Sequence, residues 1–258
     1  MTEPGADLFV TRRGFATPAA LSTAVARATL MRVAAGEVPA TFRVHRPPRI
    51  LAFSKQDAAS PNFSAAVQAA REAGFEPVIR LAGGRAAVYH EKTLALSWAV
   101  PDSRPSARTE ERFRELADLL ADSIRELGVD ARVGEVPGEY CPGAWSVNAR
   151  GETKLVGIGQ RLIAGAAHRG AVIVVGDSAR VRDPLIPVYE ALGLDWDQAT
   201  AGSIEDEVAG ITVQRVEEAI LARLGQLYEL REARVDPETL SLAERLESEH
   251  SIGSSEGL

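Results

Sequence analysis

The chain has 258 residues, of which 45% are hydrophobic and 25% charged, and 29 Lys and Arg against 36 Asp and Glu leave a net charge of −7. This composition is typical of a folded globular protein and excludes wholesale disorder and fibrous classes. An acidic chain is poorly suited to broad nucleic-acid binding. A single cysteine cannot form an intramolecular disulfide. Because we also find no apolar signal segment or membrane span, we expect an intracellular, cytoplasmic protein.

The first half of the chain predicts an opening helix, a short buried strand and a second helix, followed by three strands and a long amphipathic helix. Pro18 suits the first position of the opening helix, and Gly36 lies near its end. The basic run at residues 43–49 is interpreted as solvated loop charge. In order, the predicted elements cover residues 18–36, 50–53, 60–72, 77–81, 85–89, 93–100 and 106–127.

The second half predicts a hairpin, a core strand and two helices. The strands are expected at residues 144–148, 153–159 and 171–175, and the helices at 184–192 and 208–231. Strand groups interrupted by helices, without a regular βαβ alternation, indicate a mixed α+β fold. We expect one domain over residues 1–235 and a tail over 236–258 that is partly helical or disordered and frays.

The first candidate for chemistry is the segment from Arg80 to His90, which contains a glycine pair between two strands. Gly83 and Gly84 let backbone amides approach a ligand closely, and Arg80 and Arg85 supply positive charge. The same pattern also fits a plain hairpin turn with two solvated arginines. His90 is equally ambiguous, because a single histidine near a strand end more often satisfies a hydrogen bond than acts as a base.

The second candidate is Cys141, which lies in the turn sequence Glu139-Tyr140-Cys141-Pro142-Gly143. Proline fixes one φ angle and glycine tolerates positive φ, so the thiol is expected on an angular loop that could present a nucleophile. Most free cysteines are small buried apolar residues. The neighbouring glycine, proline and acid make a poor core segment and favour the functional interpretation.

The third candidate is Lys154, on a strand whose alternation places it on an otherwise apolar face with Val156 and Ile158. A partly desolvated ammonium would donate to a carbonyl or phosphoryl oxygen and favour a nearby thiolate. An edge lysine that prevents aggregation explains the pattern equally well. In a straight hairpin, Cys141 would lie roughly 20 Å from Lys154 at about 3.3 Å per residue. A shared site therefore requires the loop over residues 138–143 to fold back.

Taken together, the segment 80–90, the sequence Cys141-Pro-Gly and the segment Lys154 to Arg161 resemble the lipoate/octanoate protein ligase and acyltransferase family, relatives of biotin protein ligase. The likeness extends over roughly residues 15–230. It implies a biotin/lipoate protein ligase-like catalytic domain with mixed, mostly antiparallel sheets flanked by helices. Two positions depart from the family pattern, Ala82 before the glycines and Gly159 before Gln160. Neither removes a charged or nucleophilic group, so they put substrate choice in doubt more than activity.

The resemblance implies roles for individual residues. The chain is most similar to the octanoyl/lipoyl amidotransferase branch, in which Cys141 would carry the acyl group as a thioester beside Lys154 before a lysine of a lipoyl domain takes it. Lys154 and Gly157 would hold the reacting head group. The acyl pocket and other substrate-binding positions implied are Arg80, Gly83, Gly84, Arg85, Ala86, Val88, His90 and Gln160. Leu81, Val88 and Leu155 are expected to face an eight-carbon chain.

Two alternatives remain at this stage. The first is an ATP-dependent lipoate-protein ligase that forms lipoyl-adenylate with ATP and Mg, and in which Cys141 is incidental. The second is a non-catalytic protein that binds acyl groups or lipoyl domains. The preferred transferase needs no cofactor and no metal. Its expected partners are lipoyl-domain proteins such as the glycine cleavage H protein or a 2-oxoacid dehydrogenase E2, received by basic residues Arg43, Arg46, Arg49, Arg161 and Arg169.

Overall fold

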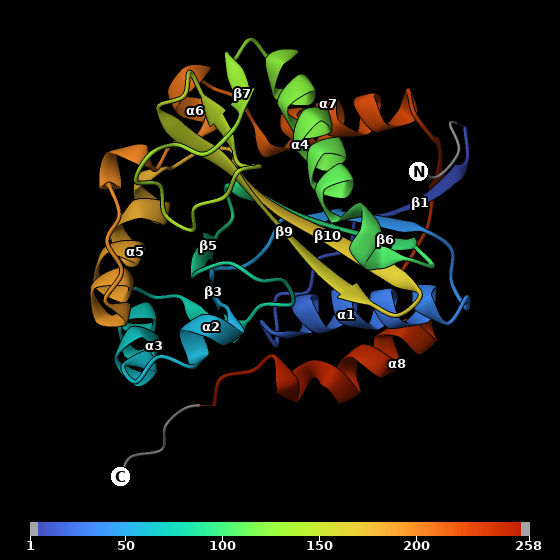
Figure 1. The fold of residues 1–258 in the computed structure, drawn as a ribbon, viewed down its shortest axis with the longest axis horizontal. Helices are drawn as coiled ribbons and strands as arrows, with labels where there is room; N and C mark the ends of the chain where they lie inside the picture. Colours follow the sequence, from blue (N-terminus) through green and yellow to red (C-terminus); the bar gives the residue numbers. More distant parts are fainter. Residues whose placement is uncertain (1–4, 254–258) are drawn as a thin grey trace.

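The computed structural model describes residues 5–253, and its centre is an eight-stranded mixed sheet (Figure 1). The pairs β11–β1 and β1–β2 are parallel, whereas the pairs from β2–β6 through β8–β7 are antiparallel. In sheet order the strands are β11 (Glu229–Glu232), β1 (Asp7–Thr11), β2 (Thr41–His45), β6 (Thr93–Pro101), β10 (Ala166–Val174), β9 (Thr153–Ile163), β8 (Val147–Ala149) and β7 (Ala131–Val133).

A second sheet of three strands lies beside the first. Its order is β4 (Glu76–Ile79), β3 (Ile50–Phe53) and β5 (Ala87–Tyr89), with β3 parallel to β4 and antiparallel to β5. Two helices pack against each other over this smaller sheet, α3 (Phe63–Glu72) and α5 (Ala179–Leu192). The fold is thus α+β with mixed, mostly antiparallel sheets flanked by helices, as the sequence predicts.

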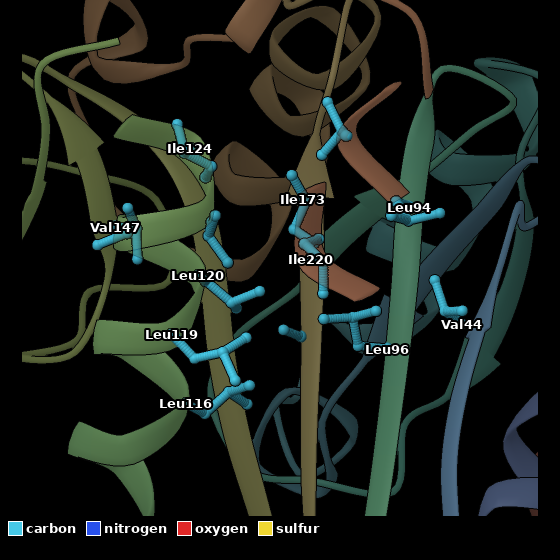
Figure 2. Packing of buried hydrophobic residues seen from close by; sticks show 14 of the residues in the cluster. Val44, Leu94, Leu96, Leu116, Leu119, Leu120, Ile124, Val147, Ile173 and Ile220 are labelled. Carbon is cyan, nitrogen blue, oxygen red and sulfur yellow. The ribbon is translucent and has the colours of Figure 1, made fainter. Parts of the chain in front are cut away.

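Helices cover both faces of the large sheet (Figure 1). Helices α4 (Thr109–Arg125) and α7 (Val213–Gly225) pack on one face, and α1 (Leu21–Ala34) packs on β6 and β10 from the other. The main core lies under α4 and α7, where Leu116, Leu120 and Ile124 along α4 belong to one cluster with Leu94 and Ile173 of the strands (Figure 2). Burial of these aliphatic stripes stabilises the packing of α4 and α7 on the sheet.

The remaining helical elements are short or C-terminal. They are α2 (Lys55–Ala58), α6 (Ile204–Glu207), α8 (Pro237–Leu246) and the 3₁₀ turns η1 (Pro105–Arg108), η2 (Gln198–Thr200) and η3 (Glu247–Glu249). Helix α8 packs on α1. In the part of the chain that the structure describes, no helix is long and apolar enough to cross a membrane.

Three sequence predictions of local structure need correction. The basic run at 43–49 begins inside strand β2, and Arg43 is buried instead of solvated. The long helix expected at 208–231 is broken: α7 ends at Gly225 and the chain returns as strand β11. The tail does not fray over residues 237–253, since α8 is followed by contacts of His250 with strand β4. Residues 254–258 lie outside the described part of the chain.

Candidate functional site

The cysteine loop is held in an unusual backbone conformation. Cys141 has φ of 45°, in the left-handed region that non-glycine residues seldom occupy. Its amide donates to the hydroxyl of Tyr189 on α5 at 2.9 Å, and that hydroxyl in turn donates to the carbonyl of Ala86 at 3.1 Å. One buried tyrosine therefore connects the cysteine loop to the glycine-rich segment. Burial raises the pKa of Tyr189 well above its usual range, so its hydroxyl remains a donor.

The sulfur of Cys141 faces the glycine-rich segment. Its Sγ accepts a hydrogen bond from the amide of Arg85 at 3.1 Å and lies 3.9 Å from Nη1 of Arg80. Burial opposes the charge of Arg80, but the nearby Cys141 and Tyr89 raise its pKa above the ordinary value. Gly84 is required here, because it has φ of 105° and a Cβ at this position would lie 2.8 Å from the sulfur. A cation and a backbone donor are thus placed to stabilise negative charge on sulfur.

The Lys154 side chain holds the cysteine loop through three hydrogen bonds. Its ammonium donates to Oε1 of Glu139 at 2.9 Å, to the carbonyl of Tyr140 at 3.0 Å and to the carbonyl of Cys141 at 2.7 Å. Lys154 and Glu139 are both buried. The same carboxylate also accepts hydrogen bonds from the loop, given by Val136 N, Gly143 N and Ser146 Oγ. A buried ion pair with every lysine proton satisfied therefore fixes the loop.

The loop folds back over the sheet, which resolves the difficulty of the straight hairpin. Gly138 has φ of 81°, and its backbone carbonyl accepts a hydrogen bond from the backbone amide of Asp197 at 2.8 Å. The chain therefore turns toward η2 before it returns to Cys141. Strand β8 is short and its register with β9 shifts between Val147 and Asn148. The structure brings Cys141 and Lys154 together, but Lys154 contacts the cysteine carbonyl while Arg80 approaches the sulfur.

A cavity of about 450 Å³ opens beside the sulfur. Arg80, Cys141 and Lys154 line it together with small residues of β9. Phe113 and Trp145 form an aromatic wall, with parallel rings whose centroids are 6.5 Å apart. The cavity is also lined by Gly83, Gly84, Ala87, Thr109, Tyr140, Pro142, Gly143, Ala144, Ser146, Gly157, Ile158, Gly159, Gln160, Leu162 and Val172. Such a hollow, mostly apolar with a few converging polar groups, is the usual form of a small-molecule site.

Four predicted site residues do not line this cavity with their side chains. The Arg85 guanidinium turns to Asp57 at 3.3 Å, so only its backbone faces the sulfur. Ala86 and Val88 point into the core beneath α3 and α5. His90 is fully buried in a turn, where its Nδ1 accepts from the amide of Lys92 and burial lowers its pKa to about 4.

The remaining expected positions divide between the cavity and other contacts. Gln160 lines the cavity, but its amide is engaged by Arg112 at 3.1 Å and by the carbonyl of Thr109 at 2.8 Å, so it ties β9 to the start of α4. Leu155 belongs to the main core and does not face a chain. Ala82 and Gly159, the two departures from the family pattern, lie opposite each other: a Cβ at Gly159 would be 3.0 Å from that of Ala82.

Two residues of the expected basic docking surface are also buried. Arg43 and Arg169 lie inside the protein, the latter over the ring of Trp98 at 3.7 Å, whereas Arg46 and Arg161 are exposed. Across residues 5–253, no group of three or more His, Cys, Asp or Glu is arranged to hold a metal ion.

Comparison with known proteins identifies the family. A model of the lipoyl protein ligase A/B catalytic domain matches residues 18–225, and the chain belongs to this family. The chain is similar to an octanoyl-[GcvH]:protein N-octanoyltransferase from Geobacillus kaustophilus, with 28% identity over 72% of this chain and 62% of that protein. It is also similar to the octanoyltransferase LipM of Kyrpidia tusciae, with 28% identity over 88% of both chains. It spans about three fifths of the octanoyl-[GcvH] relatives from G. kaustophilus and Exiguobacterium sp., 62% and 61% of their lengths.

Solved structures show the same fold. A lipoate-protein ligase A bound with ATP superposes with a TM-score of 0.74 at 18% identity, covering 95% of this chain and 94% of that one. The bipartite lipoate protein ligase of Thermoplasma acidophilum, from a study that includes its E2 lipoyl domain, superposes with a TM-score of 0.70 at 18% identity over 95% and 93% of the chains.

Several residues of the site escaped the sequence analysis. Tyr189 lies 48 positions after Cys141, and the sequence shows it only as one of several apolar residues in a predicted helix. Glu139 belongs to the cysteine turn, but its pairing with Lys154 depends on the fold-back of the loop. The aromatic wall joins α4 to the loop before β8, two segments with no local relation. An acid two positions before the single cysteine was the one available signal.

Proposed function

We propose that this protein transfers an octanoyl or lipoyl group to a lysine of a lipoyl-domain protein through a thioester on Cys141. The observation that carries the proposal is the placement of the only cysteine of the chain at the edge of the 450 Å³ cavity, with its sulfur between the Arg85 amide and the Arg80 guanidinium. A nucleophilic sulfur needs a nearby cation and an open approach, and this site supplies both.

The proposed transfer has two half-reactions. In the first, the sulfur of Cys141 attacks the acyl carbonyl of the donor, a carbon–sulfur bond forms, and the donor amine leaves with the thiol proton. In the second, the free amine of the acceptor lysine attacks the thioester, the carbon–sulfur bond breaks, and the proton of that amine returns to the sulfur. Each half-reaction places negative charge on the carbonyl oxygen, and the donors within reach are the Arg85 amide and Arg80.

In this proposal Lys154 positions the nucleophile. All three of its protons are engaged by Glu139 and by the carbonyls of Tyr140 and Cys141, so it holds the loop that carries the sulfur. This differs from the expectation that Lys154 itself contacts the acyl carbonyl. Gly157 keeps the same place in both interpretations, because a Cβ there would lie 3.6 Å from the Lys154 side chain at the cavity wall.

We propose a lipoyl-domain protein as the partner because the names of several relatives specify GcvH. Arg46, Arg49 and Arg161 are the exposed members of the predicted basic set and are the residues we assign to this docking. An acidic acceptor domain would be steered by such a local field despite the net charge of −7.

The experiment is a transfer assay without nucleotide. The purified protein is incubated with an octanoylated H protein of the glycine cleavage system and an unmodified lipoyl domain, and both are followed by intact mass spectrometry. We expect an octanoyl adduct on Cys141 and transfer to the lipoyl domain. Since the chain has one cysteine, the Cys141→Ser variant removes every possible thioester. Equal transfer by that variant would refute the proposal.

The same assay separates the two alternatives. Transfer that occurs only with ATP and Mg, accompanied by pyrophosphate exchange, would assign the protein to the adenylate-forming ligases. Binding of the octanoyl group without any adduct or transfer would assign it to non-catalytic acyl-binding proteins.

A further inference from the structure

Two large aromatic rings beside the sulfur are not used by the hydrophobic core. Phe113 of α4 and Trp145 of the loop before β8 both line the reaction cavity. Within residues 5–253, neither belongs to any of the clusters of buried apolar side chains that stabilise the fold. Both residues are only partly buried. Their surface is therefore available to contact a ligand.

The two rings do not cover each other. Their planes are within 7° of parallel and their centroids are 6.5 Å apart, at the wide end of the range for stacked aromatic pairs. Part of each ring face is therefore open to the cavity. Flat apolar faces of this kind suit an unbranched alkyl stem, because its methylenes lose contact with water when they lie on a ring.

A buried polar network holds Phe113 in place. The preceding residue, Arg112, is buried and donates to the side-chain oxygen of Gln160 at 3.1 Å. The amide of Gln160 in turn donates to the carbonyl of Thr109, in the first turn of α4, at 2.8 Å. The start of α4 is thus tied to β9, and the Phe113 ring is fixed relative to the strand that lines the cavity.

Trp145 is held by the carboxylate that also fixes the cysteine loop. The next residue, Ser146, donates its hydroxyl to Oε1 of Glu139 at 2.6 Å, and the same oxygen accepts from Lys154 at 2.9 Å. The network that positions Cys141 therefore also positions the Trp145 ring, four residues further along the chain. The ring and the sulfur keep a constant relation, as a substrate passage requires.

The rings lie between two exposed segments of the cavity rim. The loop that carries Trp145 is exposed at Pro142 and Ala144, and α4 is exposed at Arg114, next to Phe113. The strand residues that line the cavity are buried or partly buried. A side chain of a partner protein that enters between the loop and α4 therefore meets these rings before it reaches the strands.

The charges around the cavity favour a neutral amine over an ammonium ion. None of the described residues that line it is Asp or Glu, so an ammonium would find no carboxylate there. Arg80 lines the cavity and donates to the Arg85 carbonyl, with the Cys141 sulfur 3.9 Å away. Arg114 lies over the Trp145 ring, 5.4 Å from its centroid. Nearby cations and apolar walls lower the pKa of an amine, and the unprotonated amine is the form that attacks a thioester.

The cavity has room for an acyl group and a lysine side chain together. Its volume is about 450 Å³. At about 30 Å³ for each water-sized group, the eight carbons of an octanoyl group take roughly 240 Å³ and the five side-chain atoms of a lysine roughly 150 Å³. Both therefore fit at once, as the attack of a lysine on an acylated cysteine requires.

We propose that Phe113 and Trp145 form the passage through which the side chain of the acceptor lysine reaches the thioester on Cys141. The inference rests on the proposed function, in which that lysine takes the octanoyl group. The rings contact the methylenes of the lysine, and the positive charge of Arg80 favours its unprotonated amine. In the first half-reaction, the donor lysine leaves by the same passage.

The test measures the two half-reactions separately. The acyl-enzyme is formed from the N-acetylcysteamine thioester of octanoate, which carries no lysine, and is then mixed with an unmodified lipoyl domain, and both proteins are followed by intact mass spectrometry. In Phe113→Leu and Trp145→Leu, thioester formation should stay within about twofold of the parent rate. Transfer to the lipoyl domain should slow about tenfold, as the loss of about two methylene contacts allows.

Small amines test the passage in the unmodified protein. Butylamine reproduces the four-carbon stem of lysine, whereas methylamine lacks it and has similar basicity. We expect butylamine to release the octanoyl group from the parent acyl-enzyme about tenfold faster than methylamine does. Phe113→Leu and Trp145→Leu should lose this preference and react with methylamine at the parent rate.

Phe9→Leu is the matched control, because Phe9 is a partly buried ring on β1 that does not line this cavity. Both half-reactions should be unchanged in it, and thermal unfolding establishes that each variant is folded. Equal rates for the two amines in the parent would overturn this inference alone. The same holds if transfer in the folded leucine variants equals that of Phe9→Leu, or if thioester formation slows as much as transfer. No adduct on the parent protein would overturn the proposed function as well.

Discussion

The ion pair between Glu139 and Lys154 provides a quantitative test of how the nucleophile is positioned. Both residues are buried, and the carboxylate also accepts three hydrogen bonds from the cysteine loop. Glu139→Gln leaves the Lys154 ammonium without its counter-charge, and Lys154→Met leaves the Glu139 carboxylate without its counter-charge. Each single change is expected to lower the free energy of unfolding by about 3–5 kcal/mol, the usual cost of an unpaired buried charge.

The double variant separates pairing from packing. Because it removes both charges together, the loss in Glu139→Gln/Lys154→Met should be at least about 2 kcal/mol smaller than the sum of the single losses. Urea unfolding at pH 7 measures all three. Arg132→Met is the matched control, since its ion pair with Asp130 is exposed and should contribute less than about 1 kcal/mol.

Thioester formation on Cys141 is a second measurement on the same variants. If Lys154 positions Cys141, the folded single variants should also lose thioester formation while the control retains it. Additive losses of stability, or single losses no larger than that of Arg132→Met, would refute the view that this pair holds the loop.

Three further predictions follow from individual contacts. Gly84→Ala should lower the free energy of unfolding by about 1–3 kcal/mol and slow thioester formation, because Gly84 has a positive φ and the added Cβ would lie 2.8 Å from the Cys141 sulfur. Gly83→Ala is the control, because a Cβ there would meet nothing within 4 Å, and it should change stability by less than about 0.5 kcal/mol in the same urea titration. Tyr189→Phe should lower it by about 1–3 kcal/mol, since the amide of Cys141 loses its partner, and melting equal to the parent would contradict that role. The folded-state pKa of His168, about 4, lies below the unfolded value of 6.5, so unfolded chains take up the proton first and stability is lost as pH falls from 6.5 toward 4, by up to about 3 kcal/mol. His168→Gln should flatten that dependence by up to one proton, and an unchanged slope in urea titrations across this range would contradict it.

Local signals predicted much of the fold. The glycine-separated runs became β4, β5 and β6, and the amphipathic pattern after Pro105 became η1 and α4. Errors arose where non-local pairing decided the structure. The sequence predicts a helix over the residues of β11, because the pairing of this strand with β1 joins positions more than 200 residues apart. It predicts a solvated loop where β2 lies, because Arg43 and His45 are polar residues in a buried strand. Periodicity reports which face of an element is buried but not which element covers it.

The sequence by itself determined the elements and the chemical groups: one thiol on an angular turn, a glycine pair between strands, and a lysine on an apolar strand face. Only the tertiary structure decided which groups meet. It placed Arg80 beside the sulfur, gave Lys154 to Glu139, and buried Arg43. The physical reason is that local sequence specifies backbone conformation and burial, whereas the contacts of a buried charge depend on strands and loops brought together from distant parts of the chain.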